Sequence, residues 1–285
     1  MIGKYARLVV LAHSVFALPF ALWGFAVGVR EALPSDWPRR LAWVIVAVVS
    51  ARTAAMAFNR WADRQLDARN PRTAMREIPR GEVRPREALA LTGFAAGVFV
   101  LAAWQLAPIC GWLAPVALLV LLGYSYTKRF TALSHYVLGL ALGLAPVGAY
   151  LAVTERFSLP VVGIGLAVLL WVGGFDTLYA LQDEAFDRAE GLYSLPARVG
   201  EAAARRMAFL SHLAAIALLA AVGAMLYSER GRWLYAVGWL AFALFVLRQH
   251  GVSRDKSRID RAFFTHNGLA SVVFGAFAIA ALWVK

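Results

Sequence analysis

The stretch NRWADRQLDARNPRT, residues 59–73, follows directly on an apolar run and sets three oxygen-bearing side chains four residues apart. These are Asn59, Asp63 and Asp67, which in a helix lie on one face with neighbouring Cβ atoms about 5–6 Å apart. Two carboxylates at this spacing repel each other, which disfavours the helix unless a cation lies between them. The stretch therefore predicts a helix that leaves an apolar layer and binds a cation at its polar end.

The composition around this stretch is that of a helical membrane protein. The chain has 285 residues, of which 61% are hydrophobic and 16% charged, and its mean hydropathy is +0.62. A soluble domain is nearer half apolar and a quarter charged. The single cysteine, Cys110, excludes an intrachain disulfide and a cysteine-rich metal site.

Nine apolar runs are each about long enough to span a bilayer. They cover residues 8–29, 40–61, 87–107, 109–126, 132–153, 158–181, 203–227, 232–249 and 262–284. The first run is too long for the apolar core of a signal peptide, so it is interpreted as a retained span. The sequence thus predicts an all-α integral membrane protein, a bundle of nine transmembrane helices forming one polytopic domain over residues 1–285.

The basic residues predict the orientation of this bundle. Of the 29 lysines and arginines, 21 lie in the N-terminus and in the loops after spans 2, 4, 6 and 8, which share one side. Because loops rich in Lys and Arg stay in the cytoplasm, the N-terminus and the two long loops are expected to be cytoplasmic. The net charge of +12 is then explained by topology, and no nucleic-acid partner is expected.

A second stretch, DTLYALQDEAFDRAEG at residues 176–191, repeats the acidic step with Asp183 and Asp187. It ends span 6, so its loop shares a face with the loop that carries Asp63 and Asp67. Mg²⁺ fits such a pair of motifs, because it takes carboxylate oxygens and is commonly completed by substrate phosphates. The alternative for each motif alone is that its aspartates are solvated or pair with nearby arginines.

Further candidates lie near these motifs. Arg52 and Asp176 lie deeper in spans 2 and 6, and an ionisable residue inside a span is by default functional; the alternative is a structural Arg52–Asp176 pair. The segment GYSYTKRFT, residues 123–131, brings Tyr124 and Lys128 to the same side, either for function or as ordinary flanking residues. Tyr179 shares a helix face with the second motif. His13 and His135 are interpreted as structural.

These residues resemble the motifs of the UbiA superfamily of intramembrane prenyltransferases. The resemblance rests on Asn59-x-x-x-Asp63-x-x-x-Asp67, on Asp176-x-x-Tyr179-x-x-x-Asp183-x-x-x-Asp187 and on Tyr124-x-x-x-Lys128. The loops RNPRTAMREIPRGEV and GLYSLPARVG that follow the two acidic motifs are also similar, and nine apolar runs match the family's nine helices. The resemblance covers essentially the whole chain.

The resemblance implies a Mg²⁺-dependent transferase of the prokaryotic inner or plasma membrane. A polyprenyl diphosphate would bind through Mg²⁺ at Asn59, Asp63, Asp67, Asp183 and Asp187, and its loss of diphosphate would give an allylic cation that an aromatic ring attacks. Phosphate contacts are implied for Arg64, Arg72, Lys128 and Arg198. The acceptor side is assigned to Arg52, Tyr124, Asp176 and Tyr179.

The expected acceptor is a hydroxylated aromatic acid, 4-hydroxybenzoate, in respiratory quinone biosynthesis. Arg60 follows Asn59 where many ubiquinone-pathway members have Asp, which keeps open a hydroxynaphthoate of a menaquinone route. Two other classes are alternatives. A CDP-alcohol phosphotransferase would need an Asp-Gly and Ala-Arg pattern that this sequence lacks. A transporter would explain Arg52 and Asp176 inside the spans but not two metal-type motifs.

Overall fold

The computed structural model describes residues 5, 8 and 16–284, and within that part the chain folds into helices joined by turns and loops, of which the connection over residues 70–84 is the longest. Eight helices of this part are long and apolar enough to cross a bilayer. They are α3 (Trp37–Ala62), α5 (Pro85–Leu106), α6 (Pro108–Thr127), α7 (Ser134–Thr154), α8 (Leu159–Ala180), α11 (Glu201–Leu226), α12 (Glu229–Val252) and the helical segment Phe263–Ala281, whose main part is α14 (Asn267–Ala281). The prediction of an all-helical membrane protein is confirmed.

The predicted spans agree with these eight helices to within three residues at every end. The first predicted span, 8–29, overlaps α2 (Leu18–Ala32), which has only 15 residues. Most of residues 8–17, including His13, lie outside the described residues. The structure therefore gives eight candidate spans and one shorter helix where the sequence predicts nine spans.

Prolines mark where several of these helices begin. Pro85, Pro108 and Pro160 stand in the first turn of α5, α6 and α8, where a missing N–H costs nothing and the fixed φ suits the helix. The α5–α6 connection is the single residue Ala107, in an extended conformation. The predicted spans 87–107 and 109–126 likewise leave one residue between them, and the short connection makes α5 and α6 antiparallel neighbours.

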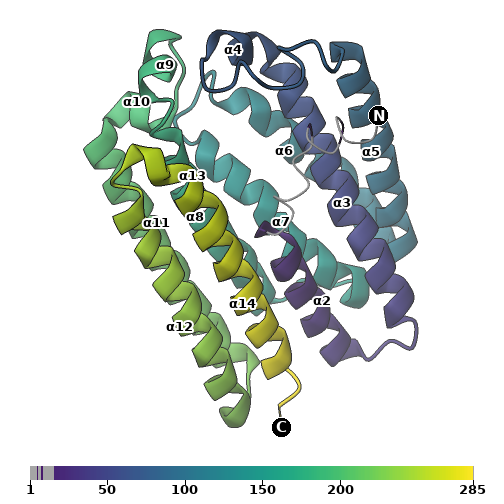
Figure 1. Ribbon diagram of the computed structural model, residues 1–285. Coiled ribbons are helices and arrows are strands. Elements are labelled where there is room, and N and C mark those ends of the chain that lie inside the picture. Colours follow the sequence, from purple (N-terminus) through teal and green to yellow (C-terminus); the bar gives the residue numbers. More distant parts are fainter. Residues whose placement is uncertain (1–4, 6–7, 9–15, 285) are drawn as a thin grey trace.

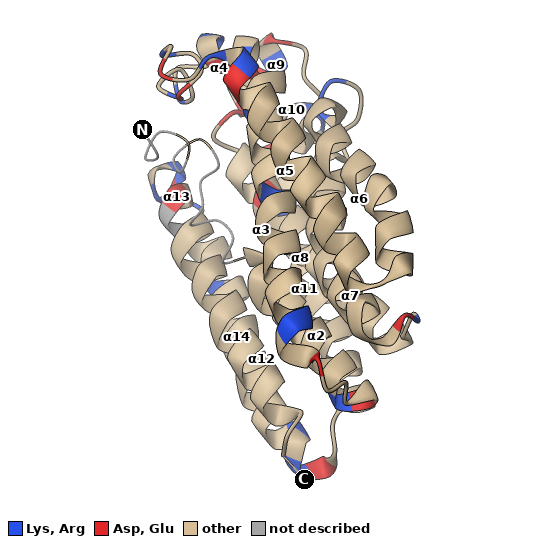
Figure 2. Ribbon diagram, turned by 90° about the vertical axis from the view of Figure 1, so that its right-hand side faces the viewer, with Lys and Arg blue, Asp and Glu red and all other residues tan. Residues whose placement is uncertain are grey.

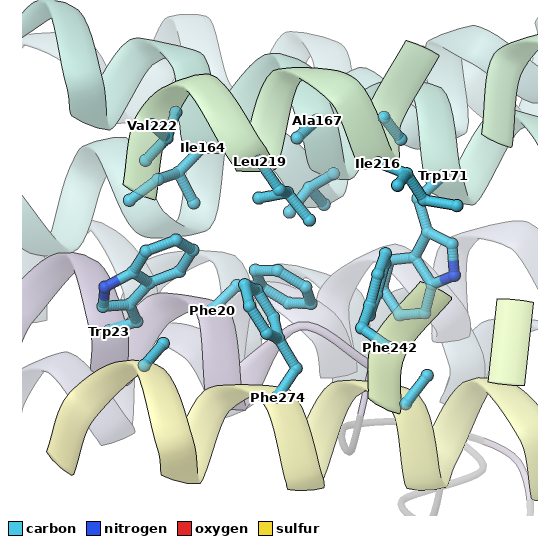
Figure 3. Packing of buried hydrophobic residues seen from close by; sticks show 14 of the residues in the cluster. Phe20, Trp23, Ile164, Ala167, Trp171, Ile216, Leu219, Val222, Phe242 and Phe274 are labelled. Carbon is cyan, nitrogen blue, oxygen red and sulfur yellow. The ribbon is translucent and has the colours of Figure 1, made fainter. Parts of the chain in front are cut away.

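The bundle has two halves that share α7. In the first half, α2, α7, α8, α11, α12 and α14 pack in a ring around an aromatic core. Phe20, Trp23, Trp171, Phe242 and Phe274 meet there from four helices, as Figure 3 shows. Their rings make close contacts, such as Trp23 with Phe274 at 5.3 Å between centroids, so this half is filled with side chains.

The second half, formed by α3, α5, α6 and α7, is hollow. Its helices enclose an apolar groove of about 340 Å³. Much of the lining is alanine, for example Ala51, Ala103, Ala117 and Ala145. Because these side chains are too short to meet across the bundle, they leave space for an apolar ligand.

Charged residues gather at one end of the bundle, here called the polar end. Short helices cover this end, as Figure 1 shows: α4 (Arg64–Arg69), α9 (Glu184–Ala189), α10 (Leu195–Val199) and α13 (Ile259–Arg261). Figure 2 shows Lys, Arg, Asp and Glu concentrated around α4, α9 and α10, with smaller groups at the opposite end. The loops after the second and sixth predicted spans, which carry the acidic motifs, therefore lie at the same end.

Candidate active site

Both acidic motifs begin where a long helix gives way to a short one. α3 ends at Ala62 and α4 begins at Arg64, with Asp63 between them. α8 ends at Ala180, and Asp183 directly precedes α9. Asp63 and Asp183 have nearly the same backbone angles, φ −93° and −102° with ψ 2° in both. The repeat predicted from the sequence is thus present as two similar helix–break–helix units, in place of two uninterrupted helices.

Cations lie beside the carboxylates, as their mutual repulsion requires. The Lys128 Nζ lies 2.6 Å and the Arg129 Nη2 3.2 Å from Asp63, on different carboxylate oxygens. The Arg76 Nη1 lies 2.6 Å from Asp67. Asp63 is only 2% exposed and Asp67 only 4%, so the basic partners replace the water that a buried carboxylate would otherwise need.

The two motifs are joined directly. From the loop after the first motif, Arg72 donates to both carboxylate oxygens of Asp183, with Nε 2.8 Å from Oδ1. Asn70 donates to the same Oδ1 at 2.8 Å. Arg72 also donates to the Tyr179 hydroxyl at 3.0 Å. These bonds link residues more than 100 positions apart, so the predicted convergence of the two loops is observed as direct contact.

The surroundings shift the pKa values of the two carboxyls in the second motif in opposite directions. Burial opposes ionisation of Asp183, but the hydrogen bonds and charge of Arg72, with help from Asn70, outweigh it and lower the pKa of Asp183. Burial and the nearby Asp183 carboxylate instead raise the pKa of Asp187. A cation bound beside Asp187 would favour its ionised form and so offset both effects.

The donor set suits a hard divalent cation. It consists of four carboxylates and the Asn59 amide, all oxygen ligands of the kind Mg²⁺ prefers. The Asp67 Oδ2 is buried and has no hydrogen-bond partner among the described residues. No group of three or more His, Cys, Asp or Glu in that part of the chain is close enough to hold a metal alone. The residues therefore fit Mg²⁺ that is completed by ligand oxygens, and not a closed protein cage.

A polar cavity of about 210 Å³ lies between the two motifs. Most of the predicted site residues line it: Asn59, Asp63, Asp67, Arg72, Tyr124, Lys128, Asp176, Tyr179, Asp183 and Asp187. Tyr124 and Leu138 line both this cavity and the apolar groove. The site therefore offers charged oxygen and nitrogen groups at one end and an apolar channel that starts at Tyr124.

Arg52 lies in the groove and not in the polar cavity. It lines the groove together with Tyr124, and its Nε has no hydrogen-bond partner among the described residues. The alternative of an Arg52–Asp176 pair is wrong, because Asp176 is bonded to His135, with the Nδ1 and Oδ2 atoms 2.6 Å apart. Arg52 thus presents a cation in a mostly apolar wall close to the junction.

Three arginines near the motifs do not line either cavity. Arg64 lies over the Trp61 ring at 4.9 Å and donates to the Trp61 carbonyl. Arg198 lies over the Tyr193 ring at 3.5 Å. Neither residue lines the polar cavity in this geometry, and the phosphate contacts expected for them stay predictions. Arg60, the residue that departs from the family pattern, is buried and absent from the cavity wall.

Other residues of the site were not singled out by the sequence. Arg76 and Arg129 bind the first motif, but among so many loop arginines no spacing distinguished them. Asn70 lies one turn beyond Asp67, and that extension of the helical series was the available signal. His135 was interpreted as structural, whereas it lines the polar cavity and binds Asp176.

Fold and site together define an integral membrane protein of the helical type, with a carboxylate-rich polar cavity that opens into an apolar groove. The UbiA prenyltransferase family model matches residues 17–283, and the chain belongs to this family of prenyltransferases. It is 34% identical over 263 residues, 91% of this chain and 88% of the relative, to a 4-hydroxybenzoate octaprenyltransferase of Aeromonas hydrophila.

Solved structures agree with this assignment. The apo structure of a UbiA homolog from Aeropyrum pernix K1 superposes with a TM-score of 0.84 at 32% identity, covering 95% of this chain and 98% of that one. A UbiA homolog from Archaeoglobus fulgidus, bound to GPP and Mg²⁺, has a TM-score of 0.69 at 20% identity and covers 99% and 100%. At this lower identity, the second match shows the same fold.

Proposed function

We propose that this protein transfers a polyprenyl group from a polyprenyl diphosphate to the ring of a hydroxylated aromatic acid, 4-hydroxybenzoate, in respiratory quinone biosynthesis. The observation that carries the proposal is the junction at Tyr124, where the carboxylate- and cation-lined cavity meets the apolar groove. A polyprenyl diphosphate has the same division, with a charged head and a long apolar tail. The name of the Aeromonas hydrophila relative supports the choice of acceptor.

The head of this substrate is assigned to the polar cavity. Asn59, Asp63, Asp67, Asp183 and Asp187 would hold Mg²⁺, which when bound offsets negative charge on the diphosphate. Bound GPP and Mg²⁺ in the Archaeoglobus fulgidus homolog support this choice of ligands. Lys128 and Arg72, now paired with Asp63 and Asp183, would contact phosphate oxygens and stabilise charge that develops as the bond to the prenyl carbon breaks. Arg64 and Arg198 would need to leave their aromatic partners to take part.

The acceptor is assigned to the junction. Breakage of the bond between the prenyl carbon and the diphosphate oxygen leaves an allylic cation, to which the aromatic ring adds before it loses a proton. Tyr124 and Tyr179 can face this cation with their rings. Arg52 would pair with the acceptor carboxylate in the groove wall, and Asp176 would accept a hydrogen bond from the acceptor hydroxyl. The surrounding helices would keep water from the cation.

The proposal includes the membrane arrangement. Residues 1–285 would form one domain of nine spans, with α2 as part of the first. The excess of Lys and Arg at the polar end supports a cytoplasmic site in the inner or plasma membrane. The groove, in the hollow half formed by α3, α5, α6 and α7, would receive the prenyl tail.

The test is direct assay of the purified full-length chain. With Mg²⁺, a polyprenyl diphosphate and a panel of aromatic acids, we expect diphosphate release matched by a prenylated ring. The panel includes 4-hydroxybenzoate and a hydroxynaphthoate, which decides between the two quinone routes. The double variant Asp63→Ala/Asp183→Ala should lose both products of the reaction. Its persistent activity would refute the assigned metal–diphosphate site, and a membrane counterflow signal without product would indicate a transporter.

A further inference from the structure

His135 connects a cavity residue to the loop that carries the second motif. It stands in the first turn of α7 and is 6% exposed. Its Nδ1 lies 2.6 Å from the Asp176 Oδ2 on α8. On the other side of the ring, the Leu195 backbone N–H donates to Nε2 at 3.3 Å. Both nitrogens of this buried ring are thus in use, each toward a different part of the site.

These bonds fix the proton on the ring. A backbone N–H can only donate, so Nε2 must carry a lone pair, and the proton of the neutral imidazole is on Nδ1. The Nδ1–H then donates to the Asp176 carboxylate. This bond to a charged acceptor is of the stronger type, and it restricts the carboxylate to one orientation at the cavity wall.

The packing of α7 against α8 holds this pair in register. A Cβ on Gly139 would lie 2.2 Å from the Leu169 carbonyl oxygen, and one on Gly143 would lie 2.4 Å from that of Gly165. The two helices therefore touch backbone to backbone along the face of α7 that begins with His135, since residues four apart share a face. Side chains at this contact have little freedom to shift.

The partner on the other side, Leu195, begins α10 in the loop that follows Asp183 and Asp187. The same loop is attached again where the Tyr193 N–H donates to the Lys128 carbonyl at 2.7 Å. His135 is therefore one of the points on which this loop rests above the cavity. Through a single ring, the placement of the loop and the placement of Asp176 are joined.

We propose that His135 is a positioning residue for the aromatic acceptor. It holds the Asp176 carboxylate in the orientation that receives the acceptor hydroxyl, while its other nitrogen anchors the start of α10. The role rests on the proposed function, which places the acceptor at Asp176. His135 itself exchanges no proton with the acceptor and acts only through Asp176.

Two substitutions of His135 test its bond to Asp176 and its bond to Leu195 one at a time. His135→Asn keeps an amide N–H near the Nδ1 position and can still donate to Asp176. His135→Gln carries its amide near the Nε2 position, where its oxygen can accept from Leu195 while Asp176 loses its donor. Because a hydrogen bond to a charged group is at stake, we expect His135→Gln to raise the KM for the aromatic acid roughly tenfold or more. His135→Asn should restore the acceptor KM to within about threefold of the wild-type value.

The KM for polyprenyl diphosphate should stay unchanged in His135→Gln, a split that general loss of structure would not produce. The double variant His135→Gln/Asp176→Asn should have the acceptor KM of Asp176→Asn alone, because His135 acts through that carboxylate. Additive effects, equal effects of the Gln and Asn variants, or an unchanged acceptor KM in His135→Gln would each overturn the proposal.

A spectroscopic measurement covers the case in which a variant does not fold. ¹⁵N NMR of histidine-labelled wild-type protein should show an Nδ1-protonated ring at His135 whose signal shifts when the aromatic acid is added. An Nε2-protonated ring would overturn the proposal. If the wild-type protein prenylates no aromatic acid, the proposed function is refuted and this role with it. If the wild-type protein is active and His135→Gln has the wild-type KM for the aromatic acid, the role alone is refuted.

Discussion

Arg72 offers the sharpest test of how the two motifs are joined. Arg72→Ala removes two hydrogen bonds to Asp183 and one to Tyr179. Breaking a fully buried pair by removing one partner costs about 3–5 kcal/mol. Here the Asp183 side chain is 16% exposed and that of Arg72 29%, and Asn70 still donates to Asp183. The free energy of unfolding should therefore fall by less than this. Arg72 would also contact a phosphate oxygen of the substrate under the proposed function, and a hydrogen bond to a charged group is worth about 1.5–3 kcal/mol. We therefore expect a loss of about 2 kcal/mol in transition-state stabilisation, or roughly 30-fold in kcat/KM for polyprenyl diphosphate.

The same change has a predicted pH dependence. In the wild type the pKa of Asp183 is lowered, so the stabilising interaction is present above the ordinary carboxyl pKa and is lost only as the pH falls through the lower folded value. Without Arg72, burial raises the pKa of this carboxyl, which then takes up a proton at a higher pH. The activity of Arg72→Ala should therefore decline at a higher pH on the acidic side than wild-type activity does.

The assay measures diphosphate release and prenylated product from about pH 8 down to about pH 3, because an interaction that depends on a carboxyl of lowered pKa is lost below about pH 5. Arg80→Ala is the matched control, because Arg80 lies in the same loop and pairs with Glu82 away from both motifs. Arg72→Lys should fall between the two, since it keeps the charge but cannot bridge both carboxylate oxygens. Equal activity and equal acidic limbs in Arg72→Ala and Arg80→Ala would refute the reasoning.

Two further predictions concern packing and substrate length. Gly139→Ala should lower the unfolding free energy in detergent by about 1–3 kcal/mol, because the new methyl group meets the Leu169 carbonyl. Gly93→Ala is the control, because a Cβ at that position would have no atom within 4 Å. Equal melting temperatures of the two variants would contradict the predicted contact. Ala117→Leu narrows the groove about 10 Å along α6 from Tyr124. It should raise the KM for a long polyprenyl diphosphate roughly tenfold and leave that for dimethylallyl diphosphate unchanged, as its five-carbon chain ends before that point; a parallel rise for both substrates would show that the groove does not hold the tail.

The sequence predicted the elements whose cause is local. An apolar run such as 158–181 becomes α8, Leu159–Ala180, because the backbone in lipid must satisfy its own hydrogen bonds. The convergence of Asp63 and Asp183 followed from counting spans, since even-numbered spans end on the same side. Neither inference needed knowledge of a side-chain contact.

What could not be predicted depends on contacts between distant segments. Whether Arg72 or Arg64 faces the cavity is decided by packing, and only the structure shows Arg64 on Trp61 and Arg72 on Asp183. His135 lies 41 positions from Asp176, and its role follows from the register of α7 on α8. The break of the helix at Asp63 was also missed, because Asp-x-x-x-Asp spacing is the same in one helix and in two consecutive ones.

The division of the bundle into a filled half and a hollow half bears on how such a protein can change over evolution. Stability is concentrated in the aromatic core of Figure 3, where a lost ring leaves a costly cavity. The wall of the groove, by contrast, contains many alanines, whose replacement alters its shape without removing an aromatic core contact. Single substitutions along α3, α6 and α7 can thus change the shape of the groove while the opposite half keeps the chain folded. Under the proposed function, such changes would let related proteins accept prenyl tails of other lengths or other acceptors.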